Sequence, residues 1–555
     1  MRMNDRFVIA LDPALIEHVI PHRSEYEANG VWPDERFGSC VAEHCARTPD
    51  AEAVIDRKGL RRITFAELDR LSNRFANWLV DNGIEQGDVI SVQLPNSLEA
   101  TVIAVGANKA GVIINPMMTV YRGKELRHIL TKTQARAIFI PGVYRGFSHP
   151  ELLSQIQQEL RHDLQVVEID IPDDDAPGAA DWIDSLQKLS DKPCGRNPSA
   201  ADVSVILFTS GTEAAPKAVM HTDQTLNSNY RSIWQSFEMG DQEVIWTPSP
   251  VGHSSGFNYG IRFALLHGAK VVLQDRWSPE EAVALVERER PTFTLAATIF
   301  LTDLLKVAES RPVDMSSLRI FACGGAPIPA AVVNEAADQG VSVLRLYGQT
   351  ECMIATSNFP SSPLQKRIDT DGGALQGYRV EIRDDEGNVL PPDTEGELCV
   401  IGPGMSIGYY DSPEQTLTKF KDGWVRTADV AIMDGDGYVT IVGRKSEIII
   451  RGGMNITPRE VEEAIEPIPG IAAVTVVGLP HERLGEYCCA CVIAEPGAKP
   501  ELEKICSDLR DLGVATYKLP ERLEIVESFP TTASGKIQRH KLVEIINKKN
   551  ENSMQ

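Results

Sequence analysis

The chain has 555 residues, of which 43% are hydrophobic and 24% charged, and its formal net charge is -23. This length exceeds what one ordinary hydrophobic core serves, so we expect at least two domains in a globular protein of ordinary composition. The negative charge argues against a nucleic-acid-binding protein, which normally presents a basic face. Any site for an anion must therefore be made locally positive against the overall field, for which Lys217, Arg444, Arg451 and Lys536 are candidates.

Targeting signals and disulfides are not expected. The first 20 residues carry Asp5, Arg6 and Asp12 where a signal peptide would be apolar, and no apolar run reaches the roughly 20 residues that span a membrane. The ten cysteines form no Cys-x-x-Cys pair. A cluster around Cys489 lies in a run typical of a strand, so we expect buried core cysteines rather than a metal site. A reducing cytoplasm fits this pattern.

The region from about residue 40 to 200 alternates helical and extended patterns. Thr64, followed three residues later by Glu67, forms a capping box that opens a helix. Residues 89–94 and 137–140 read as strands, with an apolar helix over 98–110 between them. Strands that alternate with helices predict parallel sheets flanked by helices.

The same pattern continues through a strand at 271–273, a helix at 280–289 and a strand at 318–323. After Gly377 the texture changes to short alternating strands and turns, which predicts a small β-barrel over about 378–443. A helix at 458–466, strands at 473–477 and 488–494, and a helix at 500–512 follow. The fold class is therefore α/β, with an N-terminal domain over residues 1–443 and an α+β C-terminal domain over residues 444–555.

One loop carries the first chemical signal. The apolar strand Val203–Phe208 ends at Thr209-Ser210-Gly211-Thr212, and Lys217 follows after a proline. Backbone N–H groups in such a turn form an anion cradle, hydroxyls add donors and the lysine adds a mobile charge. Taken alone, the composition favours a polar surface loop over a phosphate site, and the Walker-type G-x-x-x-x-G-K-[ST] string is absent.

Motifs further along the chain decide between these interpretations. They are Tyr347-Gly348-Gln349-Thr350-Glu351, Trp424-Val425-Arg426-Thr427-Ala428-Asp429, Gly443-Arg444-Lys445-Ser446-Glu447, Arg451-Gly452-Gly453-Met454-Asn455 and Thr532-Ala533-Ser534-Gly535-Lys536. Their order and spacing resemble the adenylate-forming superfamily of acyl- and aryl-CoA synthetases, peptide-synthetase adenylation domains and luciferases. The resemblance runs from about residue 40 to about residue 542.

The resemblance implies a two-step reaction and a set of nucleotide contacts. A carboxylic acid reacts with ATP to an acyl-adenylate, with Mg²⁺ present and pyrophosphate released, and CoA then displaces AMP. The phosphate loop is expected to hold the β- and γ-phosphates, Thr350 the α-phosphate, Glu351 the magnesium ion and Asp429 the ribose. The implied ATP/AMP contacts are Thr209, Ser210, Gly211, Thr212, Lys217, Gly324, Gly325, Ala326, Tyr347, Gly348, Gln349, Thr350, Asp429 and Arg444.

The same resemblance implies roles for the reacting groups. Lys536 would bridge the carboxylate and the α-phosphate during adenylation and stabilise the developing negative charge. His253, in Gly252-His253-Ser254-Ser255-Gly256-Phe257, would line the acyl pocket, although a core histidine that caps a strand is the alternative. This version of the motif resembles ligases for short-to-medium, alicyclic or aromatic acids. The candidate pocket walls are His253, Phe257, Thr298, Phe300, Ala322 and Met353.

The C-terminal domain is expected to rotate between the two half-reactions. That rotation would withdraw Lys536 and bring in the loop with Arg451, Gly452 and Gly453, whose glycines leave room for the pantetheine arm of CoA. Ser446 occupies the implied hinge. A simple glycine-containing hairpin turn is the alternative for this loop.

Several positions depart from the family pattern. Glu213-Ala214 stand where the phosphate loop usually has Thr-Gly, and Glu213 is expected to point to solvent, since it would repel phosphate. Ala428 replaces the usual glycine before Asp429, so a negative φ is expected there. Ser446 replaces an aspartate or lysine. None of these changes removes a group that performs chemistry.

The sequence therefore predicts an AMP-forming acyl-CoA synthetase, cytoplasmic, monomeric or homodimeric, acting on a small carboxylic acid. A free-standing adenylation enzyme that loads a carrier-protein thiol would share every motif. A non-catalytic nucleotide- or acyl-binding relative is the other alternative, against which the retained lysines and acids argue.

Overall fold

The structure is a computed structural model and describes residues 13–56, 60–171, 182–209, 216–324, 328–451, 454–481, 484–512, 514, 516–532 and 536–553. Its contacts divide the chain into two compact units, Met1–Val380 with Val400–Val425, and Glu381–Cys399 with Arg426–Gln555. The predicted domain boundary at Gly443/Arg444 stays a prediction. It marks where the C-terminal domain is expected to begin its rotation, whereas the two units are defined by how compactly their residues contact one another.

The first unit contains a nine-stranded sheet in the order β17-β16-β15-β14-β13-β11-β12-β1-β2. Its interior strand pairs are parallel, which confirms the predicted α/β pattern. The strand pairs at both edges of the sheet are antiparallel. The strands are β1 (Glu52–Asp56), β2 (Arg61–Thr64), β11 (Val244–Thr247), β12 (Lys270–Leu273), β13 (Phe293–Leu295), β14 (Ile320–Gly324), β15 (Ser342–Gln349), β16 (Met353–Ser357) and β17 (Gly373–Ala374).

A six-stranded sheet in the order β10-β9-β4-β3-β5-β8 completes the strand framework of this unit, beside a short hairpin. All its pairs are parallel except β9 with β10, which flank the predicted phosphate loop. The strands are β3 (Val89–Val92), β4 (Ile113–Pro116), β5 (Ala137–Pro141), β8 (Gln165–Ile169), β9 (Val203–Phe208) and β10 (Ala218–Thr222), with the hairpin β6 (Val143–Tyr144) and β7 (Phe147–Ser148).

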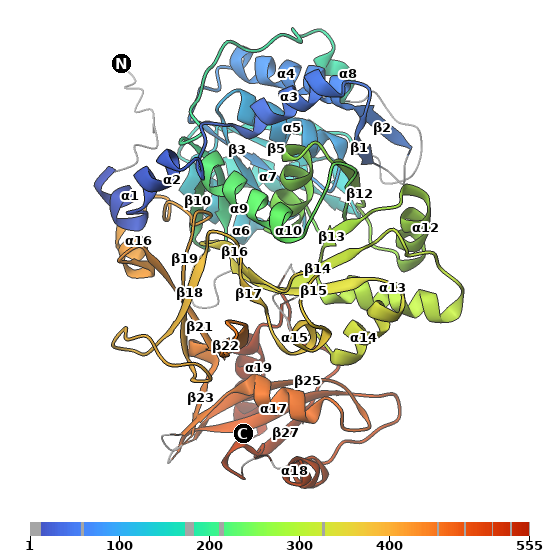
Figure 1. Cartoon of the computed structure of the whole chain (residues 1–555), viewed down its shortest axis with the longest axis vertical. Coiled ribbons are helices and arrows are strands. Elements are labelled where there is room, and N and C mark those ends of the chain that lie inside the picture. Colours follow the sequence, from blue (N-terminus) through green and yellow to red (C-terminus); the bar gives the residue numbers. More distant parts are fainter. Residues whose placement is uncertain are drawn as a thin grey trace. The chain divides into compact units, whose positions relative to one another are not determined.

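Helices cover these sheets in groups (Figure 1). Helices α3, α4, α5 and α8 pack on one another, and α12 to α15 form a second row beside β13–β15. The predicted capping box is confirmed, since Thr64 and Glu67 exchange side-chain and backbone hydrogen bonds at the start of α4. The helices are α1 (Pro13–Val19), α2 (Arg23–Ala28), α3 (Phe37–Arg47), α4 (Phe65–Asp81), α5 (Leu98–Lys109), α6 (Gly123–Thr133), α7 (His149–Gln157), α8 (Trp182–Leu186), α9 (Asp223–Ser236), α10 (Ser254–Gly256), the π-helix η2 (Phe257–Arg262), α11 (Phe263–Leu266), α12 (Pro279–Glu289), α13 (Thr298–Ser310), α14 (Ala330–Asp338), α15 (Leu364–Asp369) and α16 (Pro413–Lys419).

The predicted barrel-like region is present as an open, half-barrel sheet. Its order is β18-β19-β21-β20, and β22 also pairs with β21. Strands β20 and β22 run antiparallel to β21. The chain passes between the two compact units within this sheet, whose strands are β18 (Arg379–Arg383), β19 (Gly396–Ile401), β20 (Phe420–Lys421), β21 (Trp424–Met433) and β22 (Val439–Arg444).

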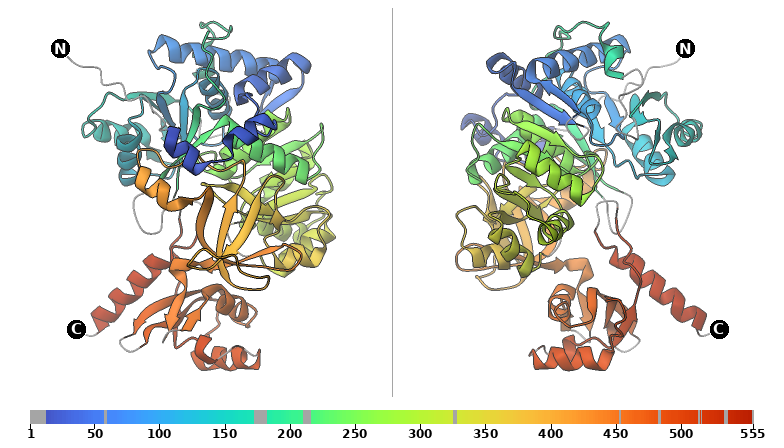
Figure 2. Two further views of the ribbon diagram at one scale, coloured as in Figure 1. Left: turned by 60° about the vertical axis from the view of Figure 1, so that its left-hand side comes forward. Right: turned by 90° about the vertical axis from the view of Figure 1, so that its right-hand side faces the viewer.

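The C-terminal part of the second unit, from η3 onward, is built around a sheet covered on both faces (Figure 2). Along β26, Cys488 and Ala490 face a core with helices α17 and α18, whereas Cys489 and Cys491 face a smaller core with α19. This alternation is the period of two expected of a strand and confirms buried cysteines. The elements are η3 (Lys445–Glu447), β23 (Ile449–Arg451), β24 (Met454–Ile456), α17 (Pro458–Ile465), β25 (Ile471–His481), β26 (Gly485–Ala494), α18 (Leu502–Asp511), η4 (Thr516–Lys518), β27 (Arg522–Ile525) and α19 (Arg539–Ser553).

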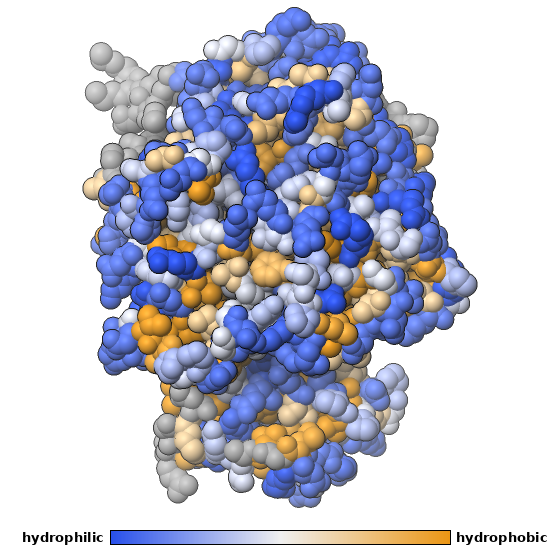
Figure 3. Space-filling model, viewed as in Figure 1, coloured by the Kyte–Doolittle hydropathy of each residue, from blue (hydrophilic) through white to orange (hydrophobic). Residues whose placement is uncertain are grey.

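On the side that Figure 3 shows, the described residues form no broad apolar face. Figure 3 shows hydrophilic residues over most of the visible side, with hydrophobic groups in separate patches. Scattered exposed apolar residues such as Val143 and Leu60 are ordinary for a globular protein. Among the described residues, no helix is long and apolar enough to cross a membrane.

A buried ion pair ties the helices of the first unit together. Arg262 on η2 donates to Asp223 on α9 at 2.6 Å, and both side chains are almost completely buried. Desolvation alone would raise the pKa of Asp223, but the Arg262 cation and hydrogen bonds from Asn108 hold it below its usual value. Asp223 also accepts the Phe37 backbone N–H at 3.2 Å. Four segments therefore meet on one carboxylate.

Replacing Arg262 with methionine leaves this carboxylate buried and uncompensated. We expect a loss of about 3–5 kcal/mol in the free energy of unfolding, measured by urea denaturation with tryptophan fluorescence. The control is Arg23→Met, which breaks the exposed pair with Glu27 and should cost at most about 0.5 kcal/mol. Equal effects of the two substitutions would contradict the assigned role.

Candidate active site

The base of the predicted phosphate loop is closed by the backbone. Phe208 on β9 stands opposite Ala218 on β10, and the Thr209 N–H donates to the Lys217 carbonyl at 3.0 Å. Thr209 and Lys217 are both half-buried. The residues between them, including Ser210, Gly211, Thr212 and the atypical Glu213-Ala214, lie outside the described part of the chain, so their roles stay predictions.

Strand β10 is also paired along its other edge. Val219 forms an antiparallel bridge with Tyr409. The Ile407 N–H donates to the Met220 carbonyl at 3.0 Å, and the Met220 N–H donates to the Gly408 carbonyl at 2.9 Å. A segment that lies about 190 residues later in the chain is thus fixed beside the end of the phosphate loop.

The Tyr347–Glu351 motif forms the tip of the β15–β16 hairpin. Gln349 pairs with Met353, so Thr350, Glu351 and Cys352 make the turn. Met353 has φ 57°, a left-handed conformation that costs a non-glycine residue about 1–2 kcal/mol. A Cβ on Gly348 would lie 2.4 Å from the Met353 carbonyl oxygen, so this position requires glycine. Strain of this kind concentrates at functional sites.

His221 on β10 holds the backbone of this hairpin tip. Its Nε2 lies 2.7 Å from the Thr350 carbonyl oxygen and its Nδ1 lies 3.1 Å from Thr225 Oγ1. Complete burial lowers the pKa of His221 to about 4, so the ring is neutral, donates through Nε2 and accepts at Nδ1. The position of Thr350, the predicted α-phosphate contact, is therefore set by a buried hydrogen bond.

Glu351 is held by two groups from the 406–410 segment. The Ser406 N–H donates to its carbonyl oxygen at 2.8 Å, and the Tyr409 hydroxyl donates to its Oε1 at 2.6 Å. Burial raises the pKa of Tyr409 and the neighbouring carboxylate raises it further, so the hydroxyl stays protonated. The ammonium of Lys217 lies over the same ring, 5.3 Å from its centre. The predicted metal ligand and the predicted phosphate lysine thus share one aromatic neighbour.

These residues suit a magnesium ion that takes one ligand from the protein and the others from water and phosphate oxygens. Among the described residues, Glu351 Oε2 accepts no hydrogen bond, and no group of three or more His, Cys, Asp or Glu side chains could enclose a metal. Mg²⁺ usually binds one or two carboxylates and completes its shell with water and phosphate oxygens. One buried carboxylate beside a phosphate loop fits that pattern.

The predicted adenine side contains a glycine with a structural reason of its own. A Cβ on Gly324 would lie 2.2 Å from the Leu346 carbonyl oxygen on the neighbouring strand. Tyr347, the predicted stacking aromatic, is buried at the end of β15. Gly325 and Ala326 lie outside the described residues. Glycine at 324 is thus required by strand packing, whatever it contributes to base binding.

His253 caps a helix rather than a strand. It precedes the one-turn helix α10, where its Nδ1 accepts the Ser255 N–H at 3.2 Å and lies 2.7 Å from Ser255 Oγ. The flanking Gly252 and Gly256 would each place a Cβ within 2.4 Å of backbone atoms. Helix η2, which follows, is a π-helix, a form that frequently marks functional sites. The predicted pocket histidine is therefore fixed on a tightly packed turn.

The candidate pocket walls belong to four segments that contact one another in pairs. Phe257, Ala322 and Met353 are all buried, on η2, β14 and β16. The Ile354 N–H, next to Met353, donates to the Tyr259 hydroxyl at 3.0 Å and joins η2 to β16. Thr298 at the start of α13 lies beside Cys323.

Phe300 is placed differently from the other wall candidates. Its ring packs edge-on against Trp277, with 4.5 Å between the ring centres, in the core cluster of the nine-stranded sheet.

In the second unit, Asp429 and Arg444 form the predicted ribose-side pair. They stand opposite each other on β21 and β22, and Arg444 Nε lies 2.8 Å from Asp429 Oδ1. The Asp429 carboxylate is 6% exposed and the arginine 42% exposed. The arginine therefore keeps the nearly buried carboxylate neutralised and in place.

The expectation of a negative φ at Ala428 is wrong. Ala428 has φ 62°, and its N–H donates to Glu397 Oε1 at 3.1 Å. The next residue, Asp429, donates its N–H to Thr427 Oγ1 at 3.0 Å. These two bonds hold the strand in a kink that a glycine would adopt without strain, so the alanine carries the cost.

The Lys536 loop is closed at its base like the phosphate loop. The Thr532 N–H donates to the Lys536 carbonyl at 2.7 Å, and the Lys536 N–H donates to Thr532 Oγ1 at 3.1 Å. Desolvation lowers the pKa of the Lys536 ammonium and the Arg444 cation lowers it further, while Asp429 and Glu447 raise it. Three predicted site residues are thus electrostatic neighbours.

Arg539 anchors this loop to the segment after Arg444. It donates to Glu447 at 2.7 Å and with one nitrogen to both carboxylate oxygens of Glu462 at 2.8 Å. Glu447 belongs to η3, the short helix that also contains Ser446, whose side chain lies outside the described part. The lysine loop and the predicted hinge are therefore joined by an ion-pair network.

The predicted CoA loop is described only at its base. Arg451 pairs with Met454 across the β23–β24 hairpin, and Gly452 and Gly453 lie outside the described residues. Arg451 makes two parallel hydrogen bonds to Glu521, at 2.9 and 2.8 Å, which lower the pKa of that carboxylate. Its charge is engaged within its own unit.

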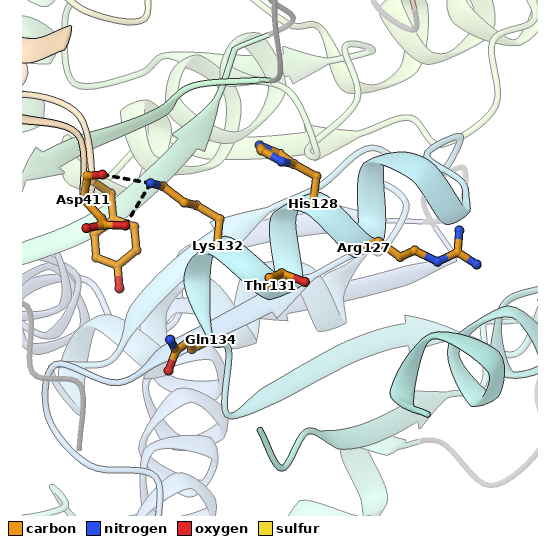
Figure 4. A pocket seen from close by; sticks show the side chains of 7 residues that line it. Arg127, His128, Thr131, Lys132, Gln134 and Asp411 are labelled. Atoms are coloured by element: carbon orange, nitrogen blue, oxygen red, sulfur yellow. Dashed lines mark hydrogen bonds and ion pairs between the residues drawn. The ribbon is translucent and has the colours of Figure 1, made fainter. Parts of the chain in front are cut away.

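A surface pocket of about 500 Å³ lies near the phosphate loop but outside the predicted site (Figure 4). In Figure 4 Lys132 reaches Asp411, at 3.1 Å, while Arg127 points away and pairs with Glu159. Its cations are thus already paired, and we assign no ligand to it. The lining residues are Arg127, His128, Thr131, Lys132, Gln134, Tyr410 and Asp411.

Sequence reasoning missed the residues that position the site. His221, Tyr259 and Tyr409 touch the Thr350–Ile354 segment from elements far away in the sequence. A histidine or tyrosine in a strand or helix is ordinary, so no local signal marked them.

The comparisons with known proteins decide the family. The AMP-binding enzyme model matches residues 41–410 and the AMP-binding enzyme C-terminal domain model matches residues 460–536. A medium-chain fatty-acid–CoA ligase from Escherichia coli (strain K12) is 36% identical over 522 residues, which are 93% of this chain and 91% of that protein. The chain belongs to the AMP-binding enzyme family.

Other relatives agree on the reaction. A feruloyl-CoA synthase from Amycolatopsis is 30% identical over 504 residues, covering 91% of this chain and 98% of that protein. The ATP-bound crystal structure of MatB from Rhodopseudomonas palustris matches with a TM-score of 0.82 at 27% identity, covering 92% of this chain and 99% of that one. This member of the family is an AMP-forming carboxylate–CoA ligase that uses ATP, CoA and Mg²⁺.

The left-handed backbone at Ala428 can be tested by restoring the glycine that is usual in the family at this position. Ala428→Gly removes the left-handed strain, worth about 1 kcal/mol, and should raise the thermal midpoint of the second unit by about 2–4 °C in calorimetry. The matched control is Ala472→Gly, at an exposed strand position without positive φ, which should lower the midpoint. A lowered midpoint for Ala428→Gly would contradict the assigned strain.

Proposed function

We propose that the acid is a monocarboxylic acid of medium chain length with an uncharged tail. The observation that carries this proposal is that the candidate wall residues Phe257, Ala322 and Met353 are apolar and buried. A second carboxylate on the tail would have to be desolvated there without a partner. The Escherichia coli relative, named for medium-chain fatty acids, supports the same class.

An aromatic acid is the second candidate. The feruloyl-CoA synthase relative, at 30% identity, favours it, and buried phenylalanine and methionine side chains also contact aromatic rings well. Pocket shape distinguishes such acids by only about 1–3 kcal/mol per methylene, so a direct comparison of substrates is needed.

We propose the following roles in adenylation. Lys217 and the phosphate loop hold the β- and γ-phosphates, Glu351 binds the magnesium ion, and Thr350 contacts the α-phosphate. Asp429 and Arg444 bind the ribose, while Lys536 stabilises the charge that develops between carboxylate and α-phosphate. The fixed hairpin tip and the closed bases of the two lysine loops support these assignments, because such groups are preorganised.

For the second half-reaction we propose that residues 444–555 move as a lid about Ser446. The loop at Arg451–Gly453 then admits the pantetheine arm of CoA. The Arg539–Glu447 pair supports this proposal, since it lets the lysine loop move together with the lid segment. We also propose a cytoplasmic monomer or homodimer, for which the ten free cysteines suit a reducing compartment.

A carboxylate panel tests the acid class. With AMP release as the readout, we expect kcat/KM for hexanoate to decanoate to exceed that for malonate by at least about 10²-fold, since a charged tail is desolvated without a partner. Benzoate and ferulate distinguish the second candidate. Equal or higher activity with malonate would contradict the apolar pocket.

The Lys536→Ala variant tests the division into half-reactions. Removing one preorganised charge should lower acid-dependent pyrophosphate exchange into ATP by about 10²- to 10³-fold. Thioester formation from supplied acyl-adenylate and CoA should stay within a few-fold of the unaltered enzyme. Lys541→Ala, at an exposed lysine of α19, is the matched control. Equal loss of both half-reactions would contradict the scheme.

A further inference from the structure

Tyr409 occupies a junction that the expected roles leave unexplained. Its side chain is almost completely buried, its hydroxyl donates to Glu351 Oε1 at 2.6 Å, and its ring centre lies 5.3 Å from the Lys217 ammonium. Among the described residues, no ion pair joins Lys217 directly to Glu351. In the described part of the chain, the tyrosine contacts both of these groups of opposite charge.

The backbone fixes Tyr409 independently of any ligand. Tyr409 pairs with Val219 on β10, and its N–H donates to Thr416 Oγ1 at 3.0 Å. The preceding Gly408 has φ 115°, and a Cβ there would lie 2.7 Å from Thr416 Cγ2. The ring therefore stands in one place before substrates arrive, which is what preorganisation requires.

The two ends of one side chain meet two different charges. The negative face of an aromatic ring attracts a cation, and the phenolic hydroxyl donates to an anion. With Oε1 of Glu351 engaged by Tyr409, Oε2 is the oxygen left for a metal. Hydrogen bonds of this kind orient metal ligands, and their loss typically lowers metal affinity 10- to 100-fold.

We propose that Tyr409 is a positioning residue that turns one oxygen of Glu351 toward the magnesium ion of bound MgATP and steadies Lys217 at the phosphate loop. The proposal rests on the magnesium role given to Glu351 under the proposed function. It adds that metal and nucleotide binding are coupled through this ring.

Tyr410 provides a matched control on the same extended segment. Neighbouring residues in such a segment point to opposite sides, and Tyr410 lines the surface pocket, with Lys132 6.0 Å from its ring centre. It is similarly buried, yet in the described part of the chain it makes no hydrogen bond or ring contact with Glu351 or Lys217. Tyr410→Phe thus makes the same chemical change at the neighbouring position of this segment.

The test measures how much Mg²⁺ improves nucleotide binding. The dissociation constant of α,β-methylene-ATP is measured by calorimetry with the full chain, once with saturating Mg²⁺ and once with EDTA. The ratio of the two constants is the coupling between metal and nucleotide. In Tyr409→Phe we expect this ratio to fall about tenfold while the EDTA value stays unchanged, whereas Tyr410→Phe keeps both values.

Two further variants separate the two ends of the ring. In Glu351→Gln, adding Tyr409→Phe should produce no further loss of coupling, since the metal ligand is already absent. Tyr409→Leu, which removes the ring, should also weaken binding in EDTA by about two- to fivefold, because Lys217 loses its aromatic neighbour.

Four outcomes would overturn the proposal. Equal weakening with and without Mg²⁺ in Tyr409→Phe would show a merely structural tyrosine, and the same loss in Tyr410→Phe would show that the segment acts as a whole. An undiminished effect of Tyr409→Phe in the Glu351→Gln background would place its action elsewhere. Absence of any Mg²⁺ effect in the unaltered enzyme would overturn the magnesium role of Glu351 itself, and with it this proposal.

Discussion

The double pairing of β10 is the constraint on which the nucleotide side of the first unit depends. One edge pairs with β9 and closes the base of the phosphate loop, while the other edge pairs with residues 407–410. The strand also carries His221, which bonds the hairpin tip at Thr350. Strand β10 is thus hydrogen-bonded along both edges and through one side chain. It cannot shift without moving β9, residues 407–410 and the hairpin tip at Thr350. Lys217, Thr350 and Glu351 are therefore located relative to one another by backbone hydrogen bonds and by the His221 side chain, none of which depends on bound nucleotide.

The protein solves its charge problem locally. A chain with net charge -23 has to hold a polyphosphate, and the lysines assigned to this task stand at loop bases that close in the same way. In each loop a threonine N–H donates to the carbonyl of the lysine, Thr209 to Lys217 and Thr532 to Lys536. This bond fixes the backbone from which the lysine side chain extends. Each positive charge is therefore carried by a side chain whose backbone position is already set before an anion binds.

Strain is stored at two positions of the predicted site. Met353 and Ala428 both adopt left-handed backbone, two residues after Glu351 and directly before Asp429 respectively. Each of these two residues interrupts the regular strand backbone close to a carboxylate of the predicted site. Hydrogen bonds from the surrounding chain over-determine both bends, through Tyr259 beside Met353 and through Glu397 at Ala428. The departure from glycine at 428 is thus tolerated by its neighbours, and it leaves Asp429 paired with Arg444.

The sequence by itself determined the elements and the reaction class, and it predicts which residues touch the substrates. Apolar periodicity gave the strands and the α/β class, and the spaced motifs around Lys217, Glu351, Asp429 and Lys536 identified the chemistry, because those groups must be particular residue types. Only the tertiary structure decided what holds them. His221 and Tyr409 act through partners more than fifty residues away, and Phe300 packs against Trp277 in the core cluster. A positioning side chain is defined by its neighbours in space, and local sequence patterns carry no record of those neighbours.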